Sequence, residues 1–305
     1  MSNTKQDNIK EILKSMPDES YNQEIVFLRE LKPFEASSCV PLADTTRAVM
    51  TEQASKKFEE LFDILKLDFR NDENLKDTPF RVASMYINEL MVGRYTMPPR
   101  IEAFPADFYE VKKPLLSDSI IAKYQEIDKI EEMLYSKRVG SLVNNELLMR
   151  GFALLKDIDD ELLFAGIEKP SIRTVISKTV DINSLCSHHL VPFVSTDDKE
   201  SKCVITYIPT IGSQTALLGI SKLQRVADWF GRRPQLQEEL NWQIHAFVSL
   251  ILRSTDVMVT FNNIVHYCEK TRGVESHCGS TSSTVFSGRF EDPEYRRLAY
   301  ELTRN

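Results

Sequence analysis

DVMVTFNNIVHYC, residues 256–268, decides the fold, because a run this rich in valine, isoleucine and phenylalanine predicts a long β-strand. Side chains alternate along a strand, so we expect His266 and Cys268 to share one face and the residues beside them to share the other. One strand would then deliver a thiol and an imidazole to the same place.

This strand belongs to a mixed set of elements that begins near Ser171. Other strand-like runs cover residues 172–181, 190–195 and 202–209, and the last alternates as a strand with one buried face should. Two predicted helices separate residues 202–209 from residues 256–268. Strands, a helix pair and a further strand together predict an α+β domain with an antiparallel sheet.

The two helices have recognisable starts. Ser221 is a good N-cap for the first, and Gln224 completes a capping box with it. The second is predicted to start at Pro234 and to bury a stripe of five apolar residues, Leu236, Leu240, Ile244, Phe247 and Ile251.

The first half of the chain is predicted to be helical. Residues 1–50 are expected to hold a short amphipathic helix and then a polar, Pro-containing segment that lies across the protein surface or a neighbouring subunit. A helical pattern from Thr51 to Gly93 places four apolar residues on one face, Phe58, Leu61, Phe62 and Leu65. Thr78-Pro79 starts a second helix there, because proline favours the first helical position.

We therefore expect three parts: an N-terminal arm and helical region (1–106), a helical insertion (107–170) and a catalytic domain (171–305). Helical runs near residues 120–135 and 145–164 mark the insertion. It contains no residue that we assign to chemistry, so we interpret it as a packing or assembly element.

Two short clusters carry the chemistry, CSHH at 186–189 and HYC at 266–268. A lone Cys-x-x-His occurs by chance, and buried cysteines usually act as small apolar residues. The second cluster favours a metal: Cys186, His189 and Cys268 give three N/S ligands with a fourth position open, as in a catalytic zinc site. His188 and His266 are then left for acid/base work, so the pattern predicts a hydrolytic site.

The helix starts offer a substrate site. Free N–H groups at Ser221, with Lys222 and Arg225 beside them, predict a phosphate cradle, although a solvated first turn is the plain alternative. Gln237 and Glu238 lie in the first turn of the second helix. They can interact favourably with the dipole of that helix, or they can recognise the hydrogen-bond donors on the edge of a purine.

Composition narrows the class of protein. Hydrophobic residues make up 42% and charged residues 27% of the 305, as in soluble globular proteins. A net charge of −7 argues against nucleic-acid binding. No apolar run could span a membrane, and the N-terminus lacks a signal-peptide core. The five cysteines fit a reducing cytoplasm.

Four motifs in this order and spacing resemble the GTP cyclohydrolase I family: CSHH at 186–189, LGISKLQR at 218–225, RPQLQE at 233–238 and HYCEKTRG at 266–273. The resemblance is close over residues 171–305 and weaker over residues 51–97. It implies the tunnelling fold, an antiparallel sheet backed by two helices. It also implies a homodecamer with active sites at subunit interfaces.

Carried over by motif, the resemblance implies Zn²⁺ on Cys186, His189 and Cys268, and acid/base roles for His188 and His266. It assigns the triphosphate to Ser221, Lys222, Arg225 and Arg272, of which Arg272 comes from the resemblance alone, and the guanine to Gln237 and Glu238. The implied reaction hydrolyses GTP at C8 to 7,8-dihydroneopterin triphosphate and formate, at the start of pterin, folate or 7-deazaguanine synthesis.

Two features depart from the family pattern. Ser187 stands where the family has glutamate, and the insertion is absent from compact members. We interpret the nearby pair His277-Cys278 as structural, with a fourth metal ligand as the alternative. Two other functions stay open: an enzyme that stops at the ring-opened formamidopyrimidine, and a non-catalytic purine-binding subunit. A zinc deaminase is excluded, because its Pro-Cys-x-x-Cys and His-x-Glu motifs are absent.

Overall fold

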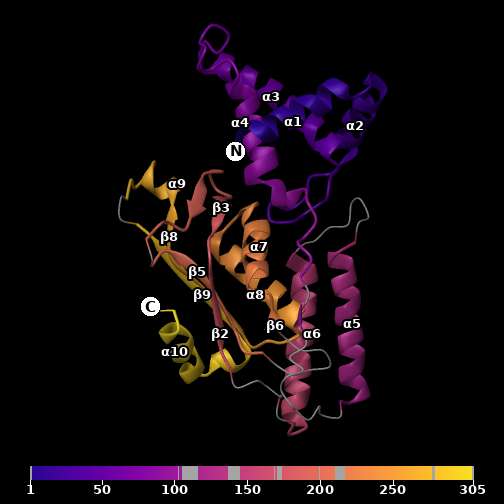
Figure 1. Ribbon diagram of the computed structural model, residues 1–305, viewed down its shortest axis with the longest axis vertical. Coiled ribbons are helices and arrows are strands. Elements are labelled where there is room, and N and C mark those ends of the chain that lie inside the picture. Colours follow the sequence, from indigo (N-terminus) through magenta and orange to yellow (C-terminus); the bar gives the residue numbers. More distant parts are fainter. Residues whose placement is uncertain are drawn as a thin grey trace.

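The computed structural model describes residues 2–101, 103–104, 116–136, 145–167, 169, 174–198, 200–209, 217–276 and 279–303. The N-terminal helices gather at one end of the molecule, a sheet with its helices forms the middle, and a long helix pair lies along one side (Figure 1). Among these residues no helix is both long and apolar enough to cross a membrane.

The N-terminal region contains α1 (Ser2–Ser15), α2 (Asp18–Glu30), α3 (Asp44–Ile64) and α4 (Thr78–Met85), followed by the short turns η1 (Tyr86–Leu90) and η2 (Val92–Arg94). The predicted polar segment after the first helix is wrong for Asp18–Glu30, where α2 lies, while residues 31–43 form a non-helical, Pro-containing segment as predicted. α2 has no buried residue, so no apolar periodicity marks it in the sequence. The helix start predicted at Thr78-Pro79 is confirmed.

The buried face of α3 differs from the predicted one. The helix begins at Asp44 rather than Thr51, and α1, α2 and α4 all pack against it. Phe62 is buried as predicted, but Leu61 and Leu65 are 42% and 58% exposed. The other buried residues of α3 lie in its first half and include threonine and serine, which an apolar pattern does not reveal.

The main sheet contains β2 (Ile176–Val180), β3 (Asn183–Cys186), β4 (Pro192–Val194), β5 (Lys202–Tyr207), β7 (Pro234–Gln235), β8 (Val257–His266) and β9 (Thr281–Phe286). β8 is central: it pairs with β5 and β9 along most of its length and with β4 at its end. All pairs are antiparallel except β3 with β7. β1 (Ala103–Phe104) and β6 (Leu217–Leu218) form a separate pair. The α+β class is confirmed.

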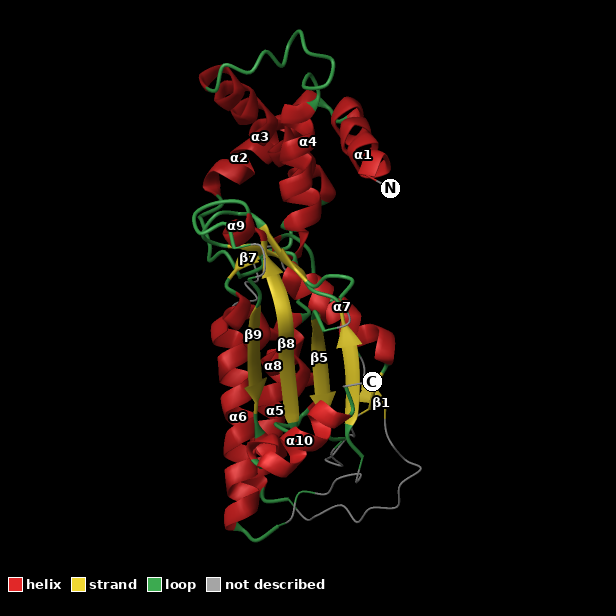
Figure 2. Cartoon of the chain, turned by 90° about the vertical axis from the view of Figure 1, so that its left-hand side faces the viewer, coloured by secondary structure: helices red, strands yellow, loops and turns green. Residues whose placement is uncertain are grey.

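Helices cover both faces of the sheet (Figure 2). α7 (Ile220–Gly231) and α8 (Gln237–Leu252) pack on one face, and η3 (Gly288–Glu291) and α10 (Pro293–Glu301) lie on the other. The prediction of one buried face for β5 is therefore wrong. Val204 and Thr206 are as buried as their neighbours, because Met258 on that face packs with Phe290 and Ala299.

Both α7 and α8 start at residues other than the predicted ones. Gly219 caps α7, and Ser221 makes no capping bond, so the predicted capping box is wrong. The Gln224 side chain instead bonds the backbone of Asp181, at 2.9 Å and 3.1 Å. α8 starts three residues after Pro234, because β7 pairs with β3, and Leu236 is 41% exposed rather than buried. The other four predicted apolar positions are buried, namely Leu240, Ile244, Phe247 and Ile251.

The helices predicted in the middle of the chain are confirmed as α5 (Asp118–Leu134) and α6 (Asn145–Phe164). This helix pair packs on α8. Arg253, at the end of α8, forms ion pairs with Asp128 at 2.5 Å and Glu131 at 2.9 Å, both on α5. The boundaries 106/107 and 170/171 lie outside the described residues, so the three-part division stays a prediction.

Candidate metal and active site

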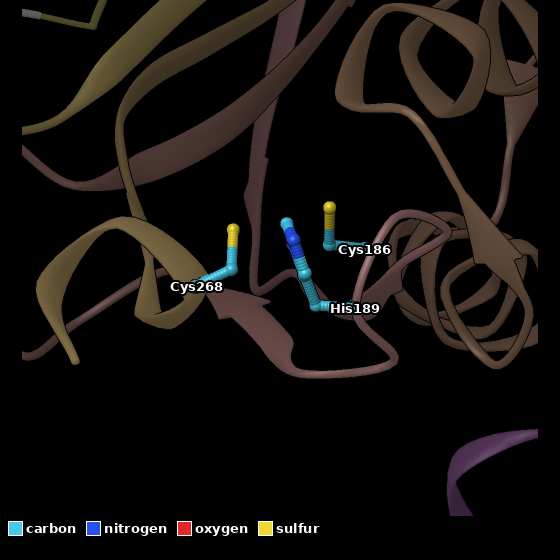
Figure 3. Close-up of side chains that lie close together, drawn as sticks. All are labelled: Cys186, His189 and Cys268. Carbon is cyan, nitrogen blue, oxygen red and sulfur yellow. The ribbon is translucent and has the colours of Figure 1, made fainter. Parts of the chain in front are cut away.

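Three ligating side chains converge at one end of the sheet. The sulfurs of Cys186 and Cys268 and a ring nitrogen of His189 all lie within 4.8 Å of one another, as the predicted metal site requires (Figure 3). Cys186 is the last residue of β3, and a tight turn brings His189 back beside it. Leu190 closes that turn: its N–H donates to Cys186 O at 2.8 Å, and its φ of 53° is in the left-handed region that leucine disfavours.

Cys268 reaches the cluster by a route that differs from the predicted one. β8 ends at His266, and the short helix α9 (Tyr267–Lys270) begins directly after it. The alternation that was expected to place Cys268 and His266 on one strand face therefore stops before Cys268. One helical turn, not the pleat of a strand, carries the thiol to Cys186.

The donor set fits a thiophilic dication. Two thiols and an imidazole are ligands that zinc prefers. Burial raises the pKa of the Cys268 thiol, and the neighbouring Cys186 raises it further, since two thiolates repel each other. A cation between the sulfurs would relieve that repulsion. Cys186 is buried and His189 is exposed, so one side of the cluster is open to solvent.

His266 lies beside this cluster in a well-defined setting. Its ring stacks on Phe193 of β4, with centroids 4.8 Å apart and planes 10° from parallel. Its Nε2 is 2.8 Å from Gln237 Oε1. Because the Gln237 amide nitrogen donates to Thr281 O, the amide oxygen faces the imidazole, so Nε2 carries the proton and Nδ1 is the free nitrogen. Burial lowers the pKa of His266, while the carboxylates of Glu238 and Glu269 oppose that shift.

Two further predicted residues border the cluster. The Nδ1 of His188 is 3.7 Å from the sulfur of Cys186, and its side chain is exposed. The Arg272 guanidinium contacts Nε2 of His189. Burial lowers the pKa of His189, and the positive charge of Arg272 lowers it further. The open side of the cluster thus combines a second imidazole with a cation.

Comparison with known proteins assigns the chain to a family. A sequence model described as GTP cyclohydrolase I matches residues 120–304. The chain belongs to the GTP cyclohydrolase I family. Similar proteins include GTP cyclohydrolase 1 of Vibrio parahaemolyticus, 26% identical over 83% of this chain and 85% of that protein. Others are GTP cyclohydrolase 1 of Photobacterium profundum, 26% identical over 81% and 82%, and of Salmonella choleraesuis, 25% identical over 79% and 76%.

Three residues that the GTP cyclohydrolase I resemblance assigns to phosphate lie far from this cluster. Ser221, Lys222 and Arg225 are in the first turns of α7. Just before α7, Leu218 N–H donates to the Tyr207 hydroxyl at 3.2 Å, and Tyr207 pairs with the first residue of β8. Leu218 is thus level with the start of β8, whereas His266 is its last residue, roughly 30 Å further along at the usual rise per strand residue. Gln224, beside Arg225, bonds the backbone of Asp181, which follows the β2 residue that is level with Phe261 through β5. The first turns of α7 therefore lie between the far end and the middle of the sheet. Figure 1 likewise has β6 and α9 at opposite ends of the sheet.

The two residues that the resemblance assigns to guanine do lie at the metal end. Gln237 and Glu238 occupy the first turn of α8, with Gln237 buried and Glu238 exposed. The Gln237 side chain is engaged within the protein, by His266, Thr281 O and Ser283 Oγ, which is a contact that sequence reasoning missed. Phe193 was missed as well, because nothing in its sequence neighbourhood links it to His266. The pair His277-Cys278 lies outside the described residues.

Proposed function

We propose that this protein is a zinc-dependent GTP cyclohydrolase I that converts GTP to 7,8-dihydroneopterin triphosphate and formate. The observation that carries the proposal is the convergence of Cys186, His189 and Cys268 within 4.8 Å. His266 and the Gln237–Glu238 turn lie next to it. Family membership supports the same reaction. A cytoplasmic location and a place at the start of pterin, folate or 7-deazaguanine synthesis belong to the proposal.

A zinc ion held by the three ligands would supply a Lewis acid that lowers the pKa of a water molecule. His266, fixed through Nε2 to Gln237, presents an unprotonated Nδ1, which would accept a proton from the water that adds at C8 and pass it to N7. The exposed carboxylate of Glu238 can accept hydrogen bonds from guanine N1–H and the amino group. His188, exposed at the rim, suits the later proton transfers at the ribose.

The triphosphate needs cations, and we propose that two subunits supply them. Arg272 lies at the metal end of its own chain, while Ser221, Lys222 and Arg225 lie on the first turns of α7, between the far end and the middle of the sheet. That separation supports a site completed by a neighbouring subunit, as the tunnelling-fold homodecamer would provide. β2 and β9 each have one strand partner among the described residues, so their outer edges are suited to joining sheets.

Incubation of the pure, zinc-loaded protein with GTP tests the proposal, with formate and pterin fluorescence followed together. We expect both to appear in equal amounts. Formate without pterin, or an accumulating formamidopyrimidine, would favour the enzyme that stops early; the exposed Ser187 motivates that second candidate. GTP binding without either product would favour the non-catalytic subunit.

A further inference from the structure

Glu239 follows the proposed guanine-binding Glu238 and holds two segments that are remote in sequence. Its Oε1 accepts a hydrogen bond from Ser37 Oγ at 2.5 Å and another from Asn145 Nδ2 at 2.6 Å. Ser37 belongs to the strap, our name for residues 34–42 between α2 and α3. Asn145 is the first residue of α6. Two separate parts of the chain therefore meet on one carboxylate oxygen.

The strap is fixed at several points, so it can act as a firm support. Its Val40 and Leu42 N–H groups donate to the carbonyls of Arg94 and Tyr95, at 2.7 Å and 2.9 Å. The buried Ser37 also accepts a hydrogen bond from Arg233 Nη1 at 2.8 Å.

Arg233 is a buried cation that the strap contacts. It is only 1% exposed, and its Nε and Nη2 have no hydrogen-bond partner among the described residues. Burial lowers the pKa of Arg233 to about 10, and Cys39 and, less strongly, Glu239 oppose that shift. Ser37 thus links the buried cation, through its carbonyl, to the nearby Glu239 carboxylate, through its hydroxyl.

Asn145 ties the helix pair to the same turn with both ends of its amide. Its Nδ2 donates to Glu239, and its Oδ1 accepts from Gln243 Nε2 at 2.7 Å. Residues 239 and 243 are one helical turn apart on α8, so the amide spans adjacent positions on one helix face. The start of α6 is therefore fixed to the start of α8.

The first three residues of α8 point in different directions and contact different parts of the molecule. Gln237 contacts His266, Glu238 is exposed toward the proposed guanine site, and Glu239 faces the strap and α6. A displacement of about 1 Å in a substrate-positioning group can cost a large factor in rate. We infer that Glu239 is a positioning residue. Through it, the strap and the helix pair hold in place the first turn of α8, which carries Gln237 and Glu238. This inference rests on the proposed function.

Asn145→Ala is the sharpest test, because it removes one donor to Glu239 and leaves the hydrogen bonds of Ser37 to Glu239 and Arg233 in place. We expect KM for GTP to rise roughly fivefold, as loss of one hydrogen bond allows. kcat should stay within about twofold, since Gln237 keeps its own bonds to His266 and β9. Affinity for guanosine should fall in step with KM, whereas affinity for inorganic tripolyphosphate should not change.

Ser37→Ala should act in the same direction. Glu239→Gln, which keeps an acceptor, should retain more guanosine affinity than Glu239→Ala. Arg150→Ala is the matched control, because Arg150 is also on α6 but pairs with Glu126 of α5 rather than with α8. It should leave KM and both affinities unchanged.

The possible results distinguish failure of this inference from failure of the proposed function. Equal losses of guanosine and tripolyphosphate binding in Asn145→Ala would indicate general loss of folded protein and overturn the inference. So would unchanged KM and guanosine affinity in Asn145→Ala and Glu239→Ala, provided that wild type converts GTP. A wild-type protein that neither binds nor converts GTP would instead remove the proposed function on which the inference rests.

Discussion

At the level of single residues, the candidate metal site is formed by two short local structures, a tight turn and a short helix. Cys186 and His189 are brought together by one tight turn that Leu190 closes, and Cys268 follows the end of β8 by one helical turn. Cys186 raises the pKa of the Cys268 thiol, and two ionised sulfurs this close repel each other unless a cation lies between them. The metal should therefore depend on all three ligands together.

Cys268→Ala should remove bound zinc and activity together. Two remaining ligands leave an incomplete site, so the loss of zinc affinity should exceed the roughly 10–100-fold that loss of an outer-shell partner costs. Metal analysis after dialysis measures it. His188→Ala is the control: it should keep zinc and lose turnover. Stoichiometric zinc in Cys268→Ala would take this cysteine out of the metal site.

Sequence spacing could predict this cluster because each ligand lies within a few residues of another chemical group of the site. It could not predict the route of Cys268, since a strand and the helix that follows it look continuous in a run such as VHYC. Gln237 was assigned by its motif, but its bond to His266 joins residues that are distant in sequence. Such contacts depend on strand pairing, which alternation alone does not give.

At the scale of elements, α8 contains a titratable group deep in the core. His245 Nε2 is 2.9 Å from Ser287 Oγ, and its ring lies edge-on to Phe152 of α6. Burial lowers its pKa from 6.5 to about 4. Below pH 6.5 the unfolded chain therefore takes up a proton that the folded protein does not, so stability falls as the pH drops toward 4.

The free energy of unfolding should consequently fall by about 2 kcal/mol between pH 7.5 and pH 5 on account of His245 alone. Urea unfolding of wild type and His245→Gln at both pH values isolates this contribution, because other titrating groups are common to both proteins. Parallel losses in the two proteins would show that His245 is not neutral in the folded core.

The junction between the N-terminal helices and α7 is another element-scale contact that sequence periodicity could not reveal. A Cβ at Gly93 would lie 2.2 Å from the carbonyl oxygen of Trp229, and Gly93 N–H donates to Arg232 O at 3.1 Å. Likewise the polar helix α2 lacks the apolar stripe that marks α5 and α6. Close backbone approaches and polar packing leave little trace in an apolar pattern.

Gly93→Ala should destabilise the protein by about 2 kcal/mol or more, because the backbone of α7 must move to make room. Gly219→Ala is the control: its new methyl group would meet the flexible Lys222 side chain at 3.3 Å and the Phe104 ring at an ordinary contact distance of 3.6 Å, so the cost should stay below about 1 kcal/mol. Thermal and urea unfolding compare the two. Equal stabilities would mean that the junction adapts.

At the scale of the whole molecule, the α7 residues that we propose bind phosphate and the candidate metal ligands lie at different levels of one sheet. The sequence could not predict this division, since motif order carries no information about which end of α7 faces the metal. The first turns of α7 lie between the far end and the middle of the sheet, and α7 approaches the metal end only at its last turn, where Gly231 packs on Asn183 of β3. We therefore expect that, if Lys222 acts on the same substrate as Cys268, the two residues come from different chains.

Mixed oligomers test that division directly. Cys268→Ala and Lys222→Ala should each be nearly inactive as pure oligomers. When they are dissociated and reassembled together in equal amounts, a site with an intact Cys268 from one chain and an intact Lys222 from its neighbour should form roughly one time in four. About a quarter of wild-type activity should then return.

A mixture of Cys268→Ala with Cys186→Ala is the control, because both changes fall in one cluster and no pairing restores it. Failure of the first mixture to recover, with subunit exchange verified by a tagged chain, would mean that Lys222 does not complete a neighbour's site.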